Sequence, residues 1–141
     1  MLGKCLCGEV QFEILEEVRN FYRCHCTLCQ KQTGASANVG TFIHKDSIKW
    51  LSGKDKLTTY TKLTGFRTNF CSCCGSPVPN PLRTSDQYWI PVGLLEDTGD
   101  RKVVVHLCTS TKPGWENIPD NEKQFSDLPD FDELNSLLNI D

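Results

Sequence analysis

The segment that decides the fold is Cys-Ser-Cys-Cys-Gly at residues 71–75, in which Cys71 and Cys74 form a C-x-x-C pair. The two sulfurs of such a pair converge at a tight turn. Gly75 tolerates the left-handed backbone that turns main-chain amides toward the sulfurs. These features are typical of a zinc knuckle, and two knuckles commonly share one tetrahedral zinc ion bound by four thiolates.

The expected partner of this segment is the C-x-C pair formed by Cys5 and Cys7 near the start of the chain. Residues two apart in a β-strand point to the same face, so both sulfurs can face one metal ion. We therefore predict a structural zinc ion bound by Cys5, Cys7, Cys71 and Cys74. Such a site closes a long loop, so zinc binding and folding should be thermodynamically coupled.

A third cluster, C-x-C-x-x-C, contains Cys24, Cys26 and Cys29 and has no obvious fourth ligand. Three protein ligands with one free position are the arrangement of a catalytic zinc. We therefore predict an open zinc site at these three residues, and two zinc ions per chain. Zinc is favoured over iron because a d¹⁰ ion accepts thiolate tetrahedra without redox chemistry.

Three alternatives to an open zinc site remain at this stage. The second site would be closed if Cys73, Cys108 or His25 supplied a fourth ligand. A redox C-x-x-C pair would need a β-α-β context, which the surrounding sequence does not indicate. Isolated cysteines, among them Cys73 and Cys108, can also be free buried thiols.

Length and composition predict one globular domain over residues 1–141. The chain has 38% hydrophobic and 23% charged residues, which is ordinary for a globular protein. Its net charge of −3 lacks the basic footprint of a nucleic-acid-binding protein. No apolar run approaches the ~20 residues that span a bilayer, so we expect no membrane association. Nine cysteines, an odd number, without an apolar signal segment favour a reducing, cytoplasmic location over a disulfide framework.

Alternation of apolar and polar residues, interrupted by turn residues, predicts an all-β domain of antiparallel sheets. The expected strands span residues 8–14, 18–23, 38–43, 47–51, 57–63, 88–94 and 102–107. Residues 30–36 are small and polar and are expected to form a loop. A short C-terminal helix is predicted over residues 130–139, where Asp130 can act as the N-cap.

Three ordered cysteine motifs resemble the glutathione-dependent formaldehyde-activating enzyme family, also called S-(hydroxymethyl)glutathione synthase, whose domain also occurs in centromere protein V. They are GKCLCGEV at residues 3–10, CHCTLCQKQTG at 24–34 and FCSCCG at 70–75. The segments VGLLED at 92–97 and KPGW at 112–115 also match, so the similarity covers roughly residues 3 to 130. Two positions depart from the family pattern: Gln30 stands where relatives often have Arg, and Cys73 is an additional thiol.

The resemblance implies a tent-like all-β fold held together by the Cys₄ zinc. It also implies the same division of ligands, with a catalytic zinc at Cys24, Cys26 and Cys29. The family's founding activity joins the thiol of glutathione to formaldehyde and is classed as a carbon–sulfur lyase. The implied partners are therefore a small thiol and a small aldehyde.

A zinc-dependent lyase-type enzyme is the function that the sequence favours. A free thiol has a pKa near ~8.5 and is mostly protonated at pH 7, so a metal that binds it as thiolate would activate it. His25, between two ligands, could relay a proton or donate to a sulfur, unless its side chain points away from the metal. The alternatives are a non-catalytic, zinc-stabilised binding module and a metal-handling or thiol-redox protein.

Overall fold

The computed structural model describes residues 1–140, which fold into two compact units, each built from two stretches of chain. Unit 1 comprises Met1–Glu17 and Phe42–Gly99, and unit 2 comprises Val18–Thr41 and the chain from Asp100 onward. Strand β4 (Asn38–His44) runs from unit 2 into unit 1. The prediction of one domain over residues 1–141 therefore stays a prediction.

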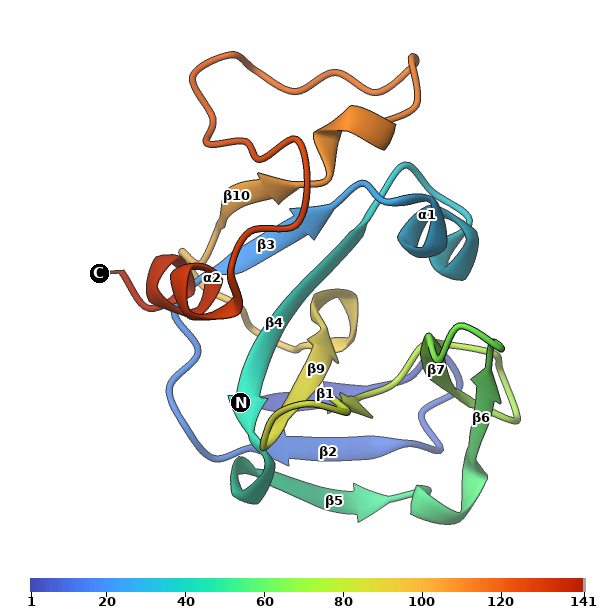
Figure 1. Cartoon of the computed structure of the whole chain (residues 1–141). Helices are drawn as coiled ribbons and strands as arrows, with labels where there is room; N and C mark the ends of the chain where they lie inside the picture. Colours follow the sequence, from blue (N-terminus) through green and yellow to red (C-terminus); the bar gives the residue numbers. More distant parts are fainter. Residues whose placement is uncertain (141) are drawn as a thin grey trace. The chain divides into compact units, whose positions relative to one another are not determined.

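Unit 1 is built from short strands joined by tight turns (Figure 1). Strands β1 (Leu2–Lys4), β2 (Gln11–Ile14) and β5 (Ile48–Ser52) form an antiparallel sheet in the order β1-β2-β5. Strands β6 (Leu57–Thr61) and β7 (Arg67–Cys71) form a hairpin, and β8 (Asn80–Pro81) pairs with β9 (Gln87–Pro91). Three 3₁₀ turns complete the unit: η1 (Lys45–Ser47), η2 (Lys54–Lys56) and η3 (Val92–Leu94).

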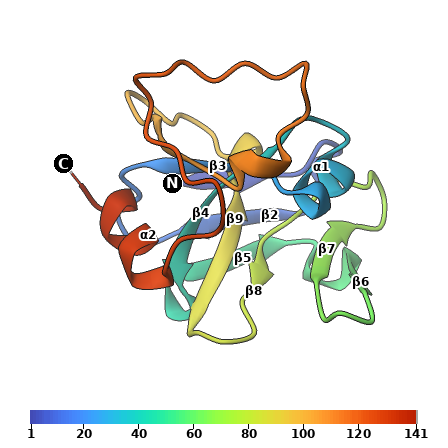
Figure 2. The same ribbon diagram turned by 45° about the horizontal axis from the view of Figure 1, so that its top comes forward.

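Unit 2 is organised around β3 (Phe21–Cys24), which pairs on one side with β10 (Val103–Leu107) and on the other with the first half of β4. Helix α1 (Thr27–Thr33) follows β3, and the 3₁₀ turn η4 (Thr109–Thr111) follows β10. A long loop then leads to helix α2 (Phe131–Leu138), and Figure 2 shows this loop as an extended excursion of the chain.

Each unit buries its own apolar side chains. In unit 1, Phe12 and Ile90 are among the residues with no exposed surface. In unit 2, α2 buries Leu134 and Leu138, which are four residues apart and therefore lie on one face of the helix. The carboxylate of Asp130 accepts a hydrogen bond from the main-chain N–H of Asp132 at 2.8 Å, which confirms the predicted N-cap.

The predicted all-β class with a short C-terminal helix is confirmed, with two corrections. First, β10 and β3 are parallel: the chain connects them through the second stretch of unit 1, Phe42–Gly99, rather than through a hairpin. Second, the prediction of a loop over residues 30–36 is wrong for residues 30–33, which belong to α1. This helix is too short to show apolar periodicity, and its ends are defined instead by the Cys26 N-cap and by Gly34, which has a φ of 69°.

Candidate metal centres

The first cysteine cluster lies in unit 1 and brings together the four residues predicted to hold a structural zinc. The sulfur atoms of Cys5, Cys7, Cys71 and Cys74 all lie within 4.8 Å of one another. The Sγ atoms of Cys5 and Cys7 are 3.6 Å apart, and those of Cys7 and Cys71 are 3.8 Å apart. Four sulfurs bound tetrahedrally to zinc at about 2.3 Å would lie ~3.8 Å from one another. The cluster therefore has the donors and the spacing of a zinc site.

A turn, rather than a strand, positions Cys5 and Cys7. The prediction that these two residues share a strand face is wrong, because β1 ends at Lys4 and β2 begins only at residue 11. The N–H of Gly8 donates to the Cys5 carbonyl at 3.1 Å, and the N–H of Val10 donates to the Cys5 sulfur at 3.3 Å. Sulfurs that accept main-chain hydrogen bonds in a tight turn are the arrangement expected of a zinc knuckle.

The second half of this cluster is the turn after β7. Gly75 has a φ of 78°, and its N–H donates to the Cys71 carbonyl at 2.7 Å, as predicted for the C-x-x-C segment. The Ser76 hydroxyl lies 3.3 Å from the Cys74 sulfur and also accepts a hydrogen bond from the N–H of Leu6 at 3.0 Å. Ser76 thus joins the two turns of the cluster. Nothing in the sequence pattern had indicated it.

The charge distribution of the first cluster favours a bound cation. The Ser76 hydroxyl and main-chain N–H lower the pKa of Cys74 to about 5. A hydrogen bond from the Glu9 N–H lowers the pKa of Cys7, but burial and the neighbouring thiols outweigh it and raise that pKa to about 12. Burial likewise raises the pKa of Cys71. A divalent cation would replace the protons on these thiols, so its affinity should rise with pH.

The second cluster lies in unit 2, where the chain passes from strand to helix. Cys24 ends β3, Cys26 is the N-cap of α1, and Cys29 lies in its first turn. Their sulfurs lie within 4.8 Å of one another. The Cys26 sulfur accepts a hydrogen bond from the N–H of Cys29 at 3.3 Å, and the Sγ atoms of these two residues are 3.1 Å apart. The end of β3 and the first turn of α1 therefore bring three thiol sulfurs, which are soft metal-binding atoms, close together.

This cluster has one side open to solvent. Cys24 and Cys29 are buried, whereas Cys26 is partly exposed. Within residues 1–140, no fourth histidine, cysteine or acidic ligand atom lies within 4.8 Å of all three sulfurs. Cys73 is exposed, which excludes the buried-thiol alternative for this residue, and Cys108 is half-buried.

The thiols of the second cluster have pKa values shifted in opposite directions. Hydrogen bonds from the Cys24 and Cys29 thiols lower the pKa of Cys26 to about 2, and main-chain N–H groups act in the same direction. The same contacts, with burial, raise the pKa of Cys24. Three adjacent negative charges would repel one another, which opposes ionisation of all three thiols without a cation. A divalent cation would allow all three to ionise, so the donor set fits zinc.

Next to the second cluster is a chain of three polar side chains, of which His25 and His106 are buried and Glu122 is partly exposed. The Nε2 atom of His25 is 3.0 Å from Nδ1 of His106, and Nε2 of His106 is 2.5 Å from the Glu122 carboxylate. His106 pairs with Arg23 in the parallel ladder, and His25 follows the end of β3 at Cys24. The contact with His106 directs the His25 ring toward β10.

The hydrogen bonds of this chain set the tautomers of both rings. A carboxylate is an acceptor only, so His106 donates through Nε2 and accepts through Nδ1 when neutral. His25 then donates through Nε2, and its buried Nδ1 has no partner among the described residues. Burial is the main cause that lowers the pKa of His25, and the neighbouring His106 acts in the same direction. The Glu122 carboxylate, which lies in the long loop, therefore fixes the orientation of both imidazole rings through these two contacts.

Glu122→Ala is expected to lower the free energy of unfolding by about 1 kcal/mol, because it removes a hydrogen bond to a charged group that is only half shielded from water. Urea denaturation of the zinc-loaded protein measures the change. Glu122→Gln keeps an acceptor and should recover most of the loss. Asp120→Ala removes an exposed acid from the same loop and should change stability by less than ~0.5 kcal/mol. Equal stability of Glu122→Ala and Asp120→Ala would contradict the contact.

Gln30, at which the sequence departs from the family pattern, has a defined structural role. Its side-chain amide donates to the carbonyl of His25 at 2.8 Å and to that of Thr111 at 3.0 Å. It therefore ties α1 to the backbone between Cys24 and Cys26 and to η4. His106, Glu122 and Thr111 were not predicted, because their partners are remote in sequence and no motif contains them.

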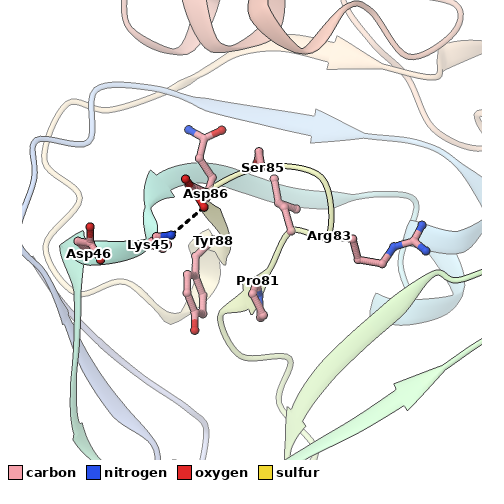
Figure 3. A pocket seen from close by; sticks show the side chains of 9 residues that line it. Lys45, Asp46, Pro81, Arg83, Ser85, Asp86 and Tyr88 are labelled. Atoms are coloured by element: carbon pink, nitrogen blue, oxygen red, sulfur yellow. Dashed lines mark hydrogen bonds and ion pairs between the residues drawn. The ribbon is translucent and has the colours of Figure 1, made fainter.

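A shallow, open groove in unit 1 contains none of the cysteines (Figure 3). It has a volume of about 520 Å³ and is lined by nine residues, among them Lys45, Arg83, Ser85 and Asp86. Lys45 and Asp86 form an ion pair at 2.8 Å, which lowers the pKa of Asp86 and raises that of Lys45. Both side chains are largely exposed, so this pair resembles ordinary surface charge more than a binding site.

Together, the fold and the two clusters define an all-β protein with two cysteine-rich groups that could hold metal ions, consistent with zinc. The model of the family described as glutathione-dependent formaldehyde-activating enzyme matches residues 1–111, and the chain belongs to this family. Membership supports a role in glutathione-dependent formaldehyde activation in general. The matched residues include both clusters, whereas Glu122 and α2 lie beyond them.

The fold has a counterpart among solved structures. A crystal structure of a Rhodobacter sphaeroides protein is similar to this chain, with a TM-score of 0.58 and 23% sequence identity. The match covers 73% of this chain and 100% of that chain. At this level of identity the likeness shows the fold alone. A comparison with curated proteins finds no match. In the part of the chain that the structure describes, no helix is both long and apolar enough to cross a bilayer.

Proposed function

We propose that this protein is a zinc-dependent carbon–sulfur lyase-type enzyme that forms or cleaves the adduct between a small thiol and a small aldehyde. Glutathione and formaldehyde are the proposed pair, because the family acts on these two molecules. The observation that carries the proposal is the second cluster, in which three thiols converge without a fourth ligand atom among the described residues within the same 4.8 Å limit.

The chemistry of the pair explains why a thiolate-binding centre is needed. Formaldehyde is a strong electrophile, whereas a free thiol with a pKa near ~8.5 is mostly protonated at neutral pH. In the forward reaction the sulfur forms a bond to the carbonyl carbon, and the thiol proton is transferred to the aldehyde oxygen. A zinc ion held by Cys24, Cys26 and Cys29 would stabilise the substrate sulfur as thiolate.

The protein's own contribution is to hold these ligands and to leave one side accessible. The N-cap hydrogen bond fixes the Cys26 sulfur relative to Cys29, and burial of Cys24 and Cys29 restricts access to the side of Cys26. Holding both reactants at this side lowers the entropic cost of their encounter, which can account for much of the acceleration. The first cluster, remote from this chemistry in sequence, is proposed as the structural zinc site.

Basic residues near the second cluster support recognition of an acidic thiol such as glutathione. Lys31 lies in the last turn of α1, is exposed, and makes no ion pair with another described residue. Arg23 is less available, because its guanidinium pairs with Glu116 at 3.4 Å. For His25, the contacts with His106 favour a positioning role over direct catalysis.

Exchange NMR with ¹³C-formaldehyde and glutathione tests the proposed activity. Zinc-loaded protein should accelerate the interconversion of free glutathione and its hydroxymethyl adduct in proportion to protein concentration. Zinc-loaded protein with formaldehyde alone is the control for non-specific addition to surface groups. An exchange rate equal to the spontaneous rate would remove glutathione and formaldehyde as the substrate pair. A non-catalytic binding module, the alternative function, would bind the thiol without changing this rate.

A further inference from the structure

Cys108 lies next to the second cluster, although it is remote from it in sequence. Its neighbour Leu107 pairs with Cys24 in the parallel ladder between β10 and β3. The Leu107 carbonyl accepts a hydrogen bond from the N–H of His25 at 2.9 Å, so the two chains stay paired up to this point. The thiol of Cys108 lies in contact with that of Cys24. A fourth sulfur is therefore held at the edge of the three-thiol cluster.

The backbone at Cys108 is fixed to the segment that carries the ligands. The Thr111 hydroxyl lies 3.1 Å from the Cys108 carbonyl and 3.2 Å from the His25 carbonyl. The N–H of Thr111 also donates to the Cys108 carbonyl, at 3.2 Å. One threonine thus ties the two strand ends together, and Cys108 cannot move away from the cluster without breaking these bonds.

Cys108 also has an unusual conformation for a residue with a side chain. Its φ of 55° and ψ of 42° lie in the left-handed region, where glycine and asparagine are the usual residues. Among the described residues, Asp97 is the other non-glycine residue with a positive φ. This backbone conformation favours glycine or asparagine, so the turn geometry does not account for a cysteine here.

The Cys108 side chain is half-buried and can reorient within the turn that follows β10. Rotation about the Cα–Cβ bond changes the distance from this sulfur to the other three without moving the backbone.

We propose that Cys108 is an exchangeable fourth ligand of the second metal centre. It completes a four-sulfur set when no thiol is bound, and an incoming thiol displaces it. This inference rests on the proposed function, since it needs a metal ion at Cys24, Cys26 and Cys29.

The exchange is balanced in bonds, protons and charge. One bond forms between the metal and the incoming sulfur, and one bond to the Cys108 sulfur breaks. The proton of the incoming thiol is transferred to Cys108, which leaves as a neutral thiol. No charge is added to the buried cluster, and the metal keeps four ligands before and after the exchange. Cys108 thereby protects the centre from water and other small ligands until the thiol substrate arrives.

Cadmium-113 NMR of the protein loaded with cadmium at both centres tests this assignment, because each centre gives one resonance that moves downfield as thiolates are added. The wild-type protein should give two resonances in the four-thiolate region. In Cys108→Gly, which keeps the left-handed backbone, one resonance should shift upfield into the three-thiolate region. Glutathione should return that resonance downfield in the variant and leave the number of thiolates unchanged in the wild type. The matched control Cys73→Ser should leave both resonances in place.

The possible failures are distinguishable. If the wild type already has one three-thiolate resonance, and Cys108→Gly does not move it, Cys108 is not a ligand and the open centre of the proposed function stands. If that centre then gains a thiolate from glutathione, the proposed function is further supported. If only one resonance appears in both proteins, the second cluster holds no metal and both proposals are overturned.

Discussion

Cys74→Ser is expected to abolish the folded state of the protein at 37 °C. The substitution removes one of four thiolates from the first cluster, in which the sulfur spacing fits zinc. A structural zinc in a small domain contributes roughly 10–16 kcal/mol of binding free energy, which is comparable with the ~5–15 kcal/mol net stability of a whole domain. Losing that centre therefore removes most of what separates the folded and unfolded states.

The position of the cluster strengthens this expectation. Cys5 and Cys71 are themselves buried and belong to the core of unit 1, together with Val10 and Val78. Partly buried apolar side chains, such as Trp50, pack against this cluster. Without metal, the four sulfurs would have to be accommodated as closely spaced thiols, and the two turns would lose the ion that joins them. The packing around them would then loosen at the same time.

Circular dichroism during thermal unfolding, combined with zinc analysis, measures this outcome. The variant should lack a cooperative transition above 37 °C and should retain less zinc than the wild type. Cys73→Ser, which removes the exposed neighbouring thiol, is the matched control and should unfold like the wild type. A Cys74→Ser protein that unfolded at the wild-type temperature would show that the first centre is not needed for the fold.

The convergence of the four sulfurs of the first cluster was predictable because each half of the cluster is local in sequence. A C-x-C pair and a C-x-x-C pair each bring two sulfurs together through a few residues of backbone, whatever the rest of the chain does. The way in which Cys5 and Cys7 converge was predicted incorrectly, since a turn and a strand can both place residues i and i+2 on one side. Spacing therefore identified which sulfurs come together without identifying the backbone conformation.

Features that depend on distant pairing were not predictable in the same way. The parallel pairing of β10 with β3 brings His106 to His25 and Cys108 to Cys24, and no local pattern signals it. Helix α1 escaped prediction because its seven residues show no apolar periodicity and its cap is a cysteine, which is not a usual capping residue. The predicted strands and the helix near the C-terminus were found because their signals are local: alternation of apolar and polar residues, residues that favour strands, or an apolar helix face.

Cys26→Ser is expected to reduce the rate of thiol–formaldehyde exchange by at least ~100-fold, since even substitutions outside the ligand shell of metal sites commonly cost 10–100-fold. The zinc content should fall from about two ions per chain to about one. Serine is isosteric with cysteine, but its hydroxyl is not ionised at neutral pH and is a poor ligand for a soft metal site. The first cluster is unchanged in this variant.

The fold should survive this substitution, for a reason specific to the position. Cys26 is the N-cap of α1, and its sulfur accepts the hydrogen bond from the N–H of Cys29. Serine is among the preferred N-cap residues, so Cys26→Ser removes the metal ligand and keeps the cap. Cys26→Ala removes both and should be less stable than Cys26→Ser by about 1 kcal/mol, with equally low activity.

Comparison of these two variants separates catalysis from folding. Thermal unfolding of Cys26→Ser close to that of the wild type, together with lost exchange activity and one lost zinc ion, is the result that the proposed function requires. If Cys26→Ser kept the wild-type exchange rate, the second centre would not be the site of the reaction. If it unfolded as completely as Cys74→Ser, the second metal ion would be structural, because a catalytic ligand on a capped helix can be removed without loss of the fold.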